Sequence, residues 1–151
     1  MAIKTYFKTY VSSLKSVLDK QYDAVFVGTG APKGRELDLP GRSEAGARVH
    51  IGIQWLASVA FEHTAKVGKK VLVLGGGNTA MDCCRTALRL GADNVKVVVR
   101  SPFAEMKASP WEIEDTMHEG IAIHDNHSPK EFVVENGKLV AMRFEVMAAN
   151  Y

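Results

Sequence analysis

The sequence has little of what marks a membrane protein, a secreted protein or a nucleic-acid-binding protein. It contains no apolar run near the ~20 residues that a membrane-spanning helix requires. Lysines and an aspartate interrupt the segment from Met1 to Gln21, which excludes the apolar core of a signal peptide. The net charge of +2 is small, and the basic residues are scattered. We therefore expect neither a membrane nor a nucleic acid as a partner.

Cysteine is scarce as well, because the chain contains only the neighbours Cys83 and Cys84. Adjacent residues of a helix point about 100° apart, so this pair suits neither a disulfide bond nor a C-x-x-C redox pair. We expect both side chains to serve structural packing. The absence of a disulfide framework favours a reducing compartment, and we predict a cytoplasmic location.

The positive evidence is concentrated between Lys69 and Arg100. An apolar, β-branched run reaches three consecutive glycines, and a helical pattern follows them until Gly91. The order strand, glycine turn, helix, strand has the length of a nucleotide-binding βαβ unit, and it carries the G-x-G-x-x-A pattern. We predict strands at 71–74 and 95–99 and a helix at 78–90. The length of 151 residues leaves room for one such domain and excludes two complete ones.

Each small residue of the glycine turn has a distinct expected role. Gly75 permits the tight turn out of the strand, Gly77 lets the backbone approach a pyrophosphate, and Ala80 lets the helix pack close to the sheet. The phosphates would meet the helix N-terminus, where free N–H groups and the helix dipole favour an anion. Asn78 is a suitable N-cap residue, so we expect the helix to start there. A glycine turn without a ligand is the structural alternative.

The residue that follows the second strand indicates which nucleotide fits. An acidic residue there would accept hydrogen bonds from a free ribose 2′-OH, whereas an arginine suits a 2′-phosphate. This chain has Arg100, with Lys107 seven residues later. We therefore predict NADP(H) in preference to NAD(H), with a solvated surface arginine as the alternative for Arg100.

The run GGGNTAMDCCRTALRLGA, followed by VVVRS and AEMKA, resembles the NADPH-binding domain of the glutamate synthase small-subunit family of flavoprotein oxidoreductases. Dihydropyrimidine dehydrogenase has a related domain. The resemblance implies that the glycine loop and the following N-T-A hold the dinucleotide, and that basic residues after the second strand hold its 2′-phosphate. Many members have two adjacent arginines where this chain has Arg100 and Ser101. The cofactor-binding residues implied are Gly75, Gly76, Gly77, Asn78, Thr79, Ala80, Arg100, Ser101 and Lys107.

The region before this unit adds a helix, a strand and a connection. An amphipathic helix is expected from Tyr10 to Leu18, and a buried strand from Asp23 to Val27 ends at glycines. An exposed connection rich in proline and glycine follows from Pro32 to Val49. By the resemblance, residues 1–48 belong to the side of a flavin domain, and residues 49–151 form the nucleotide-binding domain. We expect the chain to be truncated at both ends.

The rest of the chain predicts further elements around the same sheet. Helices are expected at 51–66 and 110–118, the second with a cap-then-proline start. A third strand at 121–123 is parallel if the crossover is right-handed. Strands at 132–134 and 139–146 flank an Asn-Gly hairpin turn, and alternation along the second strand predicts one buried face. The predicted fold class is α/β: a three-layer, Rossmann-like parallel sheet with an appended antiparallel β-hairpin.

The chain offers no clear catalytic or metal-binding group. His124 and His127 enclose an HDNH sequence, but they lack the i, i+4 register and a third ligand, so we predict no metal site. Nicotinamide and flavin carry hydride chemistry themselves, so we nominate no catalytic acid or base.

The leading hypothesis is an electron-input domain that binds NADPH and passes hydride to FAD. By the resemblance, FAD is held mainly by parts of the parent protein outside this chain, so the chain alone should be inactive. The implied partners are the flavin domain of the parent chain and a larger electron-accepting subunit. Two alternatives stay open: a non-catalytic NAD(P)-sensing module, and a stand-alone dehydrogenase, which the absence of a Tyr-x-x-x-Lys pair disfavours.

Overall fold

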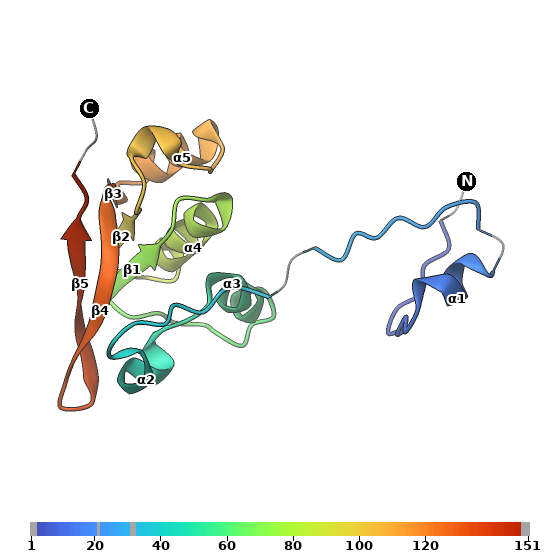
Figure 1. The fold of residues 1–151 in the computed structure, drawn as a ribbon, viewed down its shortest axis with the longest axis horizontal. Coiled ribbons are helices and arrows are strands. Elements are labelled where there is room, and N and C mark those ends of the chain that lie inside the picture. Colours follow the sequence, from blue (N-terminus) through green and yellow to red (C-terminus); the bar gives the residue numbers. More distant parts are fainter. Residues whose placement is uncertain (1–2, 21, 31–32, 149–151) are drawn as a thin grey trace. The chain divides into compact units, whose positions relative to one another are not determined.

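The computed structural model describes residues 3–20, 22–30 and 33–148 (Figure 1). The chain divides into two compact units: unit 1 comprises residues 1–31, and unit 2 comprises residues 32–151. The last three residues of the predicted nucleotide domain lie outside the described part of the chain. No helix among the described residues combines the length and the apolar character needed to cross a membrane.

Unit 1 contains one short helix, α1 (Leu14–Leu18), and no strand among its described residues. The predicted helix from Tyr10 was too long, because a short helix without a buried face has little to stabilise it. The predicted strand at 23–27 was wrong. A strand is stable when its N–H and C=O groups pair with a neighbouring strand, and the described part of unit 1 contains none.

The large apolar side chains of unit 1 lie mostly in solvent. Such side chains normally gain stability by leaving water, so unit 1 has no hydrophobic core of its own among the described residues. The exposed ones are Ile3, Tyr6, Phe7, Tyr10, Val11, Leu14, Leu18, Tyr22, Phe26 and Val27.

Unit 2 is built on a parallel sheet with the strand order β1 (Lys70–Leu74), β2 (Asn94–Val98) and β3 (Ala122–His124). Helix α4 (Asn78–Arg89) connects β1 to β2, and helix α5 (Pro110–His118) connects β2 to β3. The last residues of the three strands pair with one another, so their carboxyl ends lie at the same edge. The predicted βαβ unit and the third parallel strand are confirmed.

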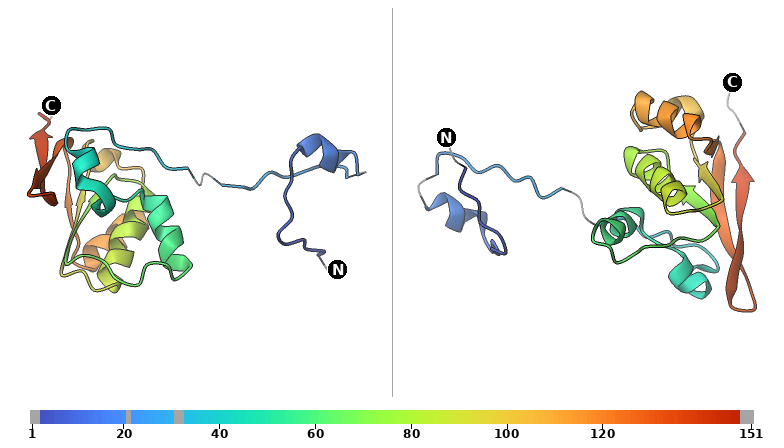
Figure 2. Two further views of the ribbon diagram at one scale, coloured as in Figure 1. Left: turned by 90° about the horizontal axis from the view of Figure 1, so that it is seen from below. Right: turned by 180° about the vertical axis from the view of Figure 1, so that it is seen from behind.

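Helices α4 and α5 lie on one side of the parallel sheet, and a β-hairpin lies on the other (Figure 1, Figure 2). The hairpin consists of β4 (His127–Glu135) and β5 (Lys138–Val146), which pair antiparallel. Its turn residues Asn136 and Gly137 have φ angles of 50° and 71°, the positive values that a type I′ turn requires. These layers confirm the predicted fold class.

The hairpin is less buried than its sequence alternation predicts. In β5, Val140 and Val146 are 52% and 68% exposed, so the predicted buried face was partly wrong. The buried side chain comes from the facing strand, where Phe132 is only 6% exposed. The hairpin strands have 9 residues, whereas the strands of the parallel sheet have 3 to 5, so the sheet covers only part of β5.

The core of unit 2 lies between the parallel sheet and its crossover helices. Its largest fully buried side chains are those of Met81, Val97, Thr116 and Cys84. Helix α3 (Gly52–Ala60) packs against α4, and a Cβ at Gly52 would lie 3.1 Å from the Sγ of Cys83. The predicted helix at 51–66 was too long, because the N–H groups of His63 and Thr64 both donate to the carbonyl of Ser58 and turn the chain.

The connection before α3 packs on the hairpin. The N–H of Phe132 donates to the carbonyl of Pro40 (2.8 Å), and helix α2 (Arg42–Ala45) begins two residues later. Gly41 between them has a φ of +79°, and a Cβ there would collide with the carbonyl oxygen of Phe132, so the position requires glycine. Residues 33–48 therefore pack within unit 2, while their assignment to a flavin domain stays a prediction from the resemblance.

Candidate functional site

The predicted glycine loop lies at the carboxyl edge of the sheet, between β1 and α4. The N–H of Gly75 donates to the carbonyl of Val98 (3.0 Å), which ties the loop to the end of β2. Gly75 has a φ of +129°, a backbone conformation that favours glycine and suits the tight turn expected there. A Cβ at Gly75 would lie 3.9 Å from the Cβ of Ala80, so the loop and the first turn of α4 are close together.

The other two glycines of the loop differ in their surroundings. A Cβ at Gly76 would lie 2.9 Å from the Cγ1 of Val99 and 3.2 Å from the Cγ of Met106. A Cβ at Gly77 would meet no atom within 4 Å. Gly76 is therefore required by packing against the protein itself, whereas the space in front of Gly77 is open to a ligand.

Four consecutive backbone N–H groups are available at this loop. Within residues 33–148, the N–H groups of Gly76, Gly77, Asn78 and Thr79 donate no hydrogen bond to the protein. The last two belong to the N-terminus of the 12-residue helix α4, where the helix dipole adds to the positive potential. These donors, together with the open space at Gly77, fit the needs of a pyrophosphate group.

The expectation that Asn78 caps α4 was wrong, because the N-cap residue is Gly77. The side chain of Asn78 is turned to the start of α5 instead. Its Oδ1 accepts the backbone N–H of Ser109 (2.7 Å), and its Nδ2 donates to the hydroxyl of Ser109 (3.3 Å). An N-cap side chain would accept one N–H group of its own helix. The Asn78 side chain instead makes two hydrogen bonds, both with Ser109.

The glycine loop is also bonded to the segment that carries Lys107. The carbonyl of Gly76 accepts the N–H groups of Lys107 (3.0 Å) and Ala108 (2.9 Å). With the bond from Ser109 to Asn78, every N–H group of the segment 107–109 donates either to the glycine loop or to the first residue of α4. Sequence reasoning missed this connection, because Ser109 carries only the signal of a helix start.

The residues expected at a 2′-phosphate follow β2 at the same edge of the sheet. Arg100 and Lys107 are exposed, and neither forms an ion pair with another described residue. Ser101 is half-buried, and its carbonyl accepts the N–H of Asn126 (3.3 Å). Two unpaired cations and a row of open N–H groups give this edge a positive field, which suits a phosphorylated ligand.

A turn after β3 supports the segment that follows Arg100. The Oδ2 of Asp125 accepts the backbone N–H of Phe103 (2.8 Å). In the sequence, the only indication of this role is that aspartate is common in turns. The rings of His124 and His127 lie edge to face, with centroids 6.2 Å apart. The described residues contain no group of three or more side chains that could hold a metal ion.

A cluster of charges joins the two crossover helices. Arg85 of α4 contacts Glu112 (2.8 Å), Asp115 (3.2 Å) and Glu119 (2.8 Å) of α5 and its C-terminus. The hydrogen bond from Arg85 holds the pKa of Glu119 below its ordinary value, and the same bond raises the pKa of Arg85. The cluster therefore fixes α4 against α5, and with them the loops at the start of each helix.

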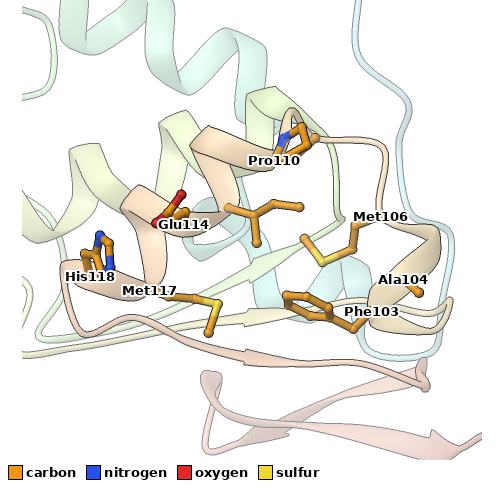
Figure 3. Close-up of a pocket in the computed structure, with 9 residues that line it drawn as sticks. Phe103, Ala104, Met106, Pro110, Glu114, Met117 and His118 are labelled. Atoms are coloured by element: carbon orange, nitrogen blue, oxygen red, sulfur yellow. The ribbon is translucent and has the colours of Figure 1, made fainter.

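An apolar groove of about 450 Å³ lies beside α5 (Figure 3). The side chains of Phe103, Met106 and Met117 converge on it from the segment after β2 and from α5. No residue of the glycine loop lines this groove. The open N–H groups of the glycine loop therefore do not face into it.

The chain is similar to known proteins both in sequence and in fold. Residues 3–149 match the sequence family described as pyridine nucleotide-disulphide oxidoreductase. The chain belongs to this family. Curated relatives of this chain include glutamate synthase small chains and beta subunits of NADPH-dependent oxidoreductases, which confirms the resemblance drawn from the sequence.

Two relatives are much longer than the part of them that this chain matches. It is 36% identical over 127 residues to the NADP(+)-dependent formate dehydrogenase subunit beta of Moorella thermoacetica, covering 83% of this chain and 18% of the relative. It is 35% identical over 127 residues to the glutamate synthase [NADPH] small chain of Halomonas elongata, covering 78% of this chain and 26% of the relative. The chain thus spans about a fifth to a quarter of the length of these relatives.

A solved structure shows the same fold. The thioredoxin reductase of Lactococcus lactis, in its FR conformation, matches with a TM-score of 0.62 at 21% identity. The match covers 79% of this chain and 37% of that chain. Over the matched part, this chain therefore shares the fold of that thioredoxin reductase.

Proposed function

We propose that this chain is the NADPH-binding domain of a flavin-dependent oxidoreductase, and that it presents NADPH to a flavin domain for hydride transfer to FAD. The observation that carries the proposal is the row of four open N–H groups at the glycine loop, in front of the open space at Gly77. The exposed cations Arg100 and Lys107 support it, because they offer a place for a 2′-phosphate.

Each part of the site has one task in this proposal. The backbone of the glycine loop and the first turn of α4 bind the pyrophosphate, and the side chains after β2 bind the 2′-phosphate. Gly75 and Ala80 let the loop and the first turn of α4 lie close together. The proposed cofactor-binding residues are Gly75, Gly76, Gly77, Asn78, Thr79, Ala80, Arg100, Ser101 and Lys107.

The hydride is supplied by NADPH when it is bound, and the residues of this chain bind and orient that cofactor. FAD would be held mainly by other parts of the parent protein, which is consistent with a chain that spans only 18% and 26% of two relatives. The proposed partners are the flavin domain of the parent chain and a larger electron-accepting subunit. The proposed location is the cytoplasm.

The test is the selective loss of NADPH when Arg100 is removed. A charge-assisted hydrogen bond contributes about 1.5–3 kcal/mol, so Arg100→Ala should weaken NADPH binding by roughly tenfold to a hundredfold. NADH has no 2′-phosphate, so its binding should hardly change. Isothermal titration calorimetry with both nucleotides measures the two affinities.

Lys96 provides the matched control for this test. It is an exposed cation within β2, whereas Arg100 follows that strand, and it lies away from the carboxyl edge of the sheet, so Lys96→Ala should leave both affinities unchanged. Equal losses of NADPH and NADH in Arg100→Ala would contradict the 2′-phosphate assignment and leave Arg100 as a surface charge.

A further inference from the structure

The two parts of the proposed site are connected through backbone and side-chain hydrogen bonds. The glycine loop would hold the pyrophosphate, and Lys107 would hold the 2′-phosphate. The segment 107–109 donates three N–H groups, two to the carbonyl of Gly76 and one to the Oδ1 of Asn78, the first residue of α4. Of these acceptors, only the Asn78 amide is a side chain, so it is the only one that a substitution can remove.

We propose that Asn78 is a positioning residue that holds the segment 107–109 against the glycine loop and thereby sets the preference for NADPH over NADH. This inference rests on the proposed function. Asn78 acts through Ser109, since both polar atoms of its amide are engaged by that residue (2.7 Å and 3.3 Å). Its side chain is therefore satisfied by the protein and is not needed by the pyrophosphate.

The contrast with Thr79 supports this division of roles. Both residues are exposed and both belong to the first turn of α4. The hydroxyl of Thr79 makes no hydrogen bond to another described residue and can turn to a bound phosphate, whereas the amide of Asn78 is committed to the start of α5. The backbone N–H of Asn78 stays open in the same row as that of Thr79.

The position of Lys107 explains why the effect should be selective. Lys107 lies two residues before Ser109, and its flexible side chain reaches a 2′-phosphate only if the backbone of this segment is held in place. Loss of one hydrogen bond that holds the segment should weaken NADPH by about fivefold to tenfold. NADH uses the glycine loop alone, so its affinity should change by less than about twofold.

The experiment compares three variants of the 151-residue chain by calorimetry with NADPH and with NADH. Asn78→Ala removes the acceptor, and Ser109→Pro removes the N–H donor at a residue whose φ of −60° already suits proline. Both should lower the ratio of NADPH to NADH affinity by the same factor. Asn78→Asp keeps an oxygen for the Ser109 N–H, so its ratio of NADPH to NADH affinity should lie nearer to that of the unchanged chain than the ratio of Asn78→Ala does.

Amide hydrogen exchange gives a readout that does not depend on nucleotide binding. The N–H of Ser109 should exchange faster in Asn78→Ala and at the unchanged rate in Asn78→Asp.

Two results would overturn the role of Asn78. Equal weakening of NADPH and NADH in Asn78→Ala would make Asn78 a direct pyrophosphate ligand, and an unchanged ratio in a folded Asn78→Ala would show that the bond to Ser109 does not set the preference. Failure of the proposed function would give a different result, because the unchanged chain would then bind NADPH and NADH equally. That result would also overturn the role of Asn78.

Discussion

The runs 24–30 and 71–77 are alike in sequence and different in structure. Each places apolar, β-branched residues before two glycines that are separated by one residue. The second run forms β1 and pairs with β2, whereas the first forms no strand and leaves Phe26 94% exposed. The cause lies in the elements that come after each run. Helix α4 and β2 return the chain to the side of β1, and the described part of unit 1 offers no second strand.

This difference teaches that the surroundings of a glycine turn decide whether it can offer N–H groups to a ligand. At 75–77 the turn runs into the N-terminus of a 12-residue helix and is bonded to the segment 107–109. At 28–30 no helix begins within the described residues that come next, so these residues bring no row of helix N–H groups together. Nucleotide binding, folding free energy and acid sensitivity should therefore all reside in unit 2.

The largest expected effect is the loss of nucleotide binding when the open glycine of unit 2 is filled. Gly77→Val places a branched side chain where the pyrophosphate would approach, at a φ of −104° that valine readily adopts. We expect the affinities for NADPH and NADH to fall about a thousandfold, which corresponds to the loss of two charge-assisted hydrogen bonds. Calorimetry on the folded variant measures this loss.

The corresponding glycine of unit 1 provides the control. Gly30 has a φ of +69°, which asparagine tolerates better than other residues, so Gly30→Asn keeps the local backbone. Both nucleotides should bind this variant as they bind the unchanged chain. Normal binding by Gly77→Val, or an equal loss in Gly30→Asn, would remove the distinction between the two turns.

The next effect concerns the free energy of unfolding. Val97 of β2 is fully buried, so Val97→Ala leaves a cavity in the core and should cost about 2 kcal/mol. Phe26→Ala removes a much larger side chain from unit 1, but that side chain lies in solvent, so the change should stay within about 0.5 kcal/mol. Urea unfolding followed by circular dichroism measures both. A larger cost for Phe26→Ala would show that unit 1 has a core of its own.

The smallest expected effect is on the pH dependence of the unfolding free energy. The pKa of Glu119 is lowered from 4.5 in the folded chain by its hydrogen bond with Arg85, so ionised Glu119 stabilises the fold. This stabilisation is fully present above the unfolded pKa and is lost as the pH falls through the lowered folded pKa. Glu119→Gln should therefore make the unfolding free energy fall less steeply below about pH 4.5 in acid titrations.

The matched control for the acid titration is again in unit 1. Lys15 and Asp19 form an i, i+4 pair in which the side chains are 84% and 64% exposed. Such exposed pairs contribute little to stability, so Asp19→Asn should leave the acid profile unchanged. An identical profile for Glu119→Gln and the unchanged chain would mean that the charge cluster between α4 and α5 does not stabilise the fold.

Sequence patterns located most elements of unit 2 because the local signals there agree with the final contacts. Gly91 and Gly120 end the two crossover helices with φ angles of 91° and 78°, and Pro110 begins α5 in the first turn as expected. Asn136 and Gly137 form the hairpin turn. The boundaries of the glycine loop could be predicted for the same reason, since the change from strand to helix is local.

Contacts between distant segments could not be predicted in this way. The partner of Asn78 lies 31 residues away, so no local pattern distinguishes its capping role from its contact with Ser109. The packing of Gly41 on Phe132 likewise joins segments that have no common motif. The strand expected at 23–27 failed for the same physical reason, because its propensity was visible and its lack of a pairing partner was not.

The tight approach of α3 to α4 has a practical consequence for chemical labelling. Cys83 is 6% exposed and Cys84 is fully buried, and burial raises the pKa of the Cys83 thiol to about 12. Alkylating reagents attack the thiolate, so both native cysteines should stay unmodified at neutral pH. A fluorophore could then be placed at one introduced site, for example through Glu135→Cys at the exposed end of β4, without first replacing either native thiol.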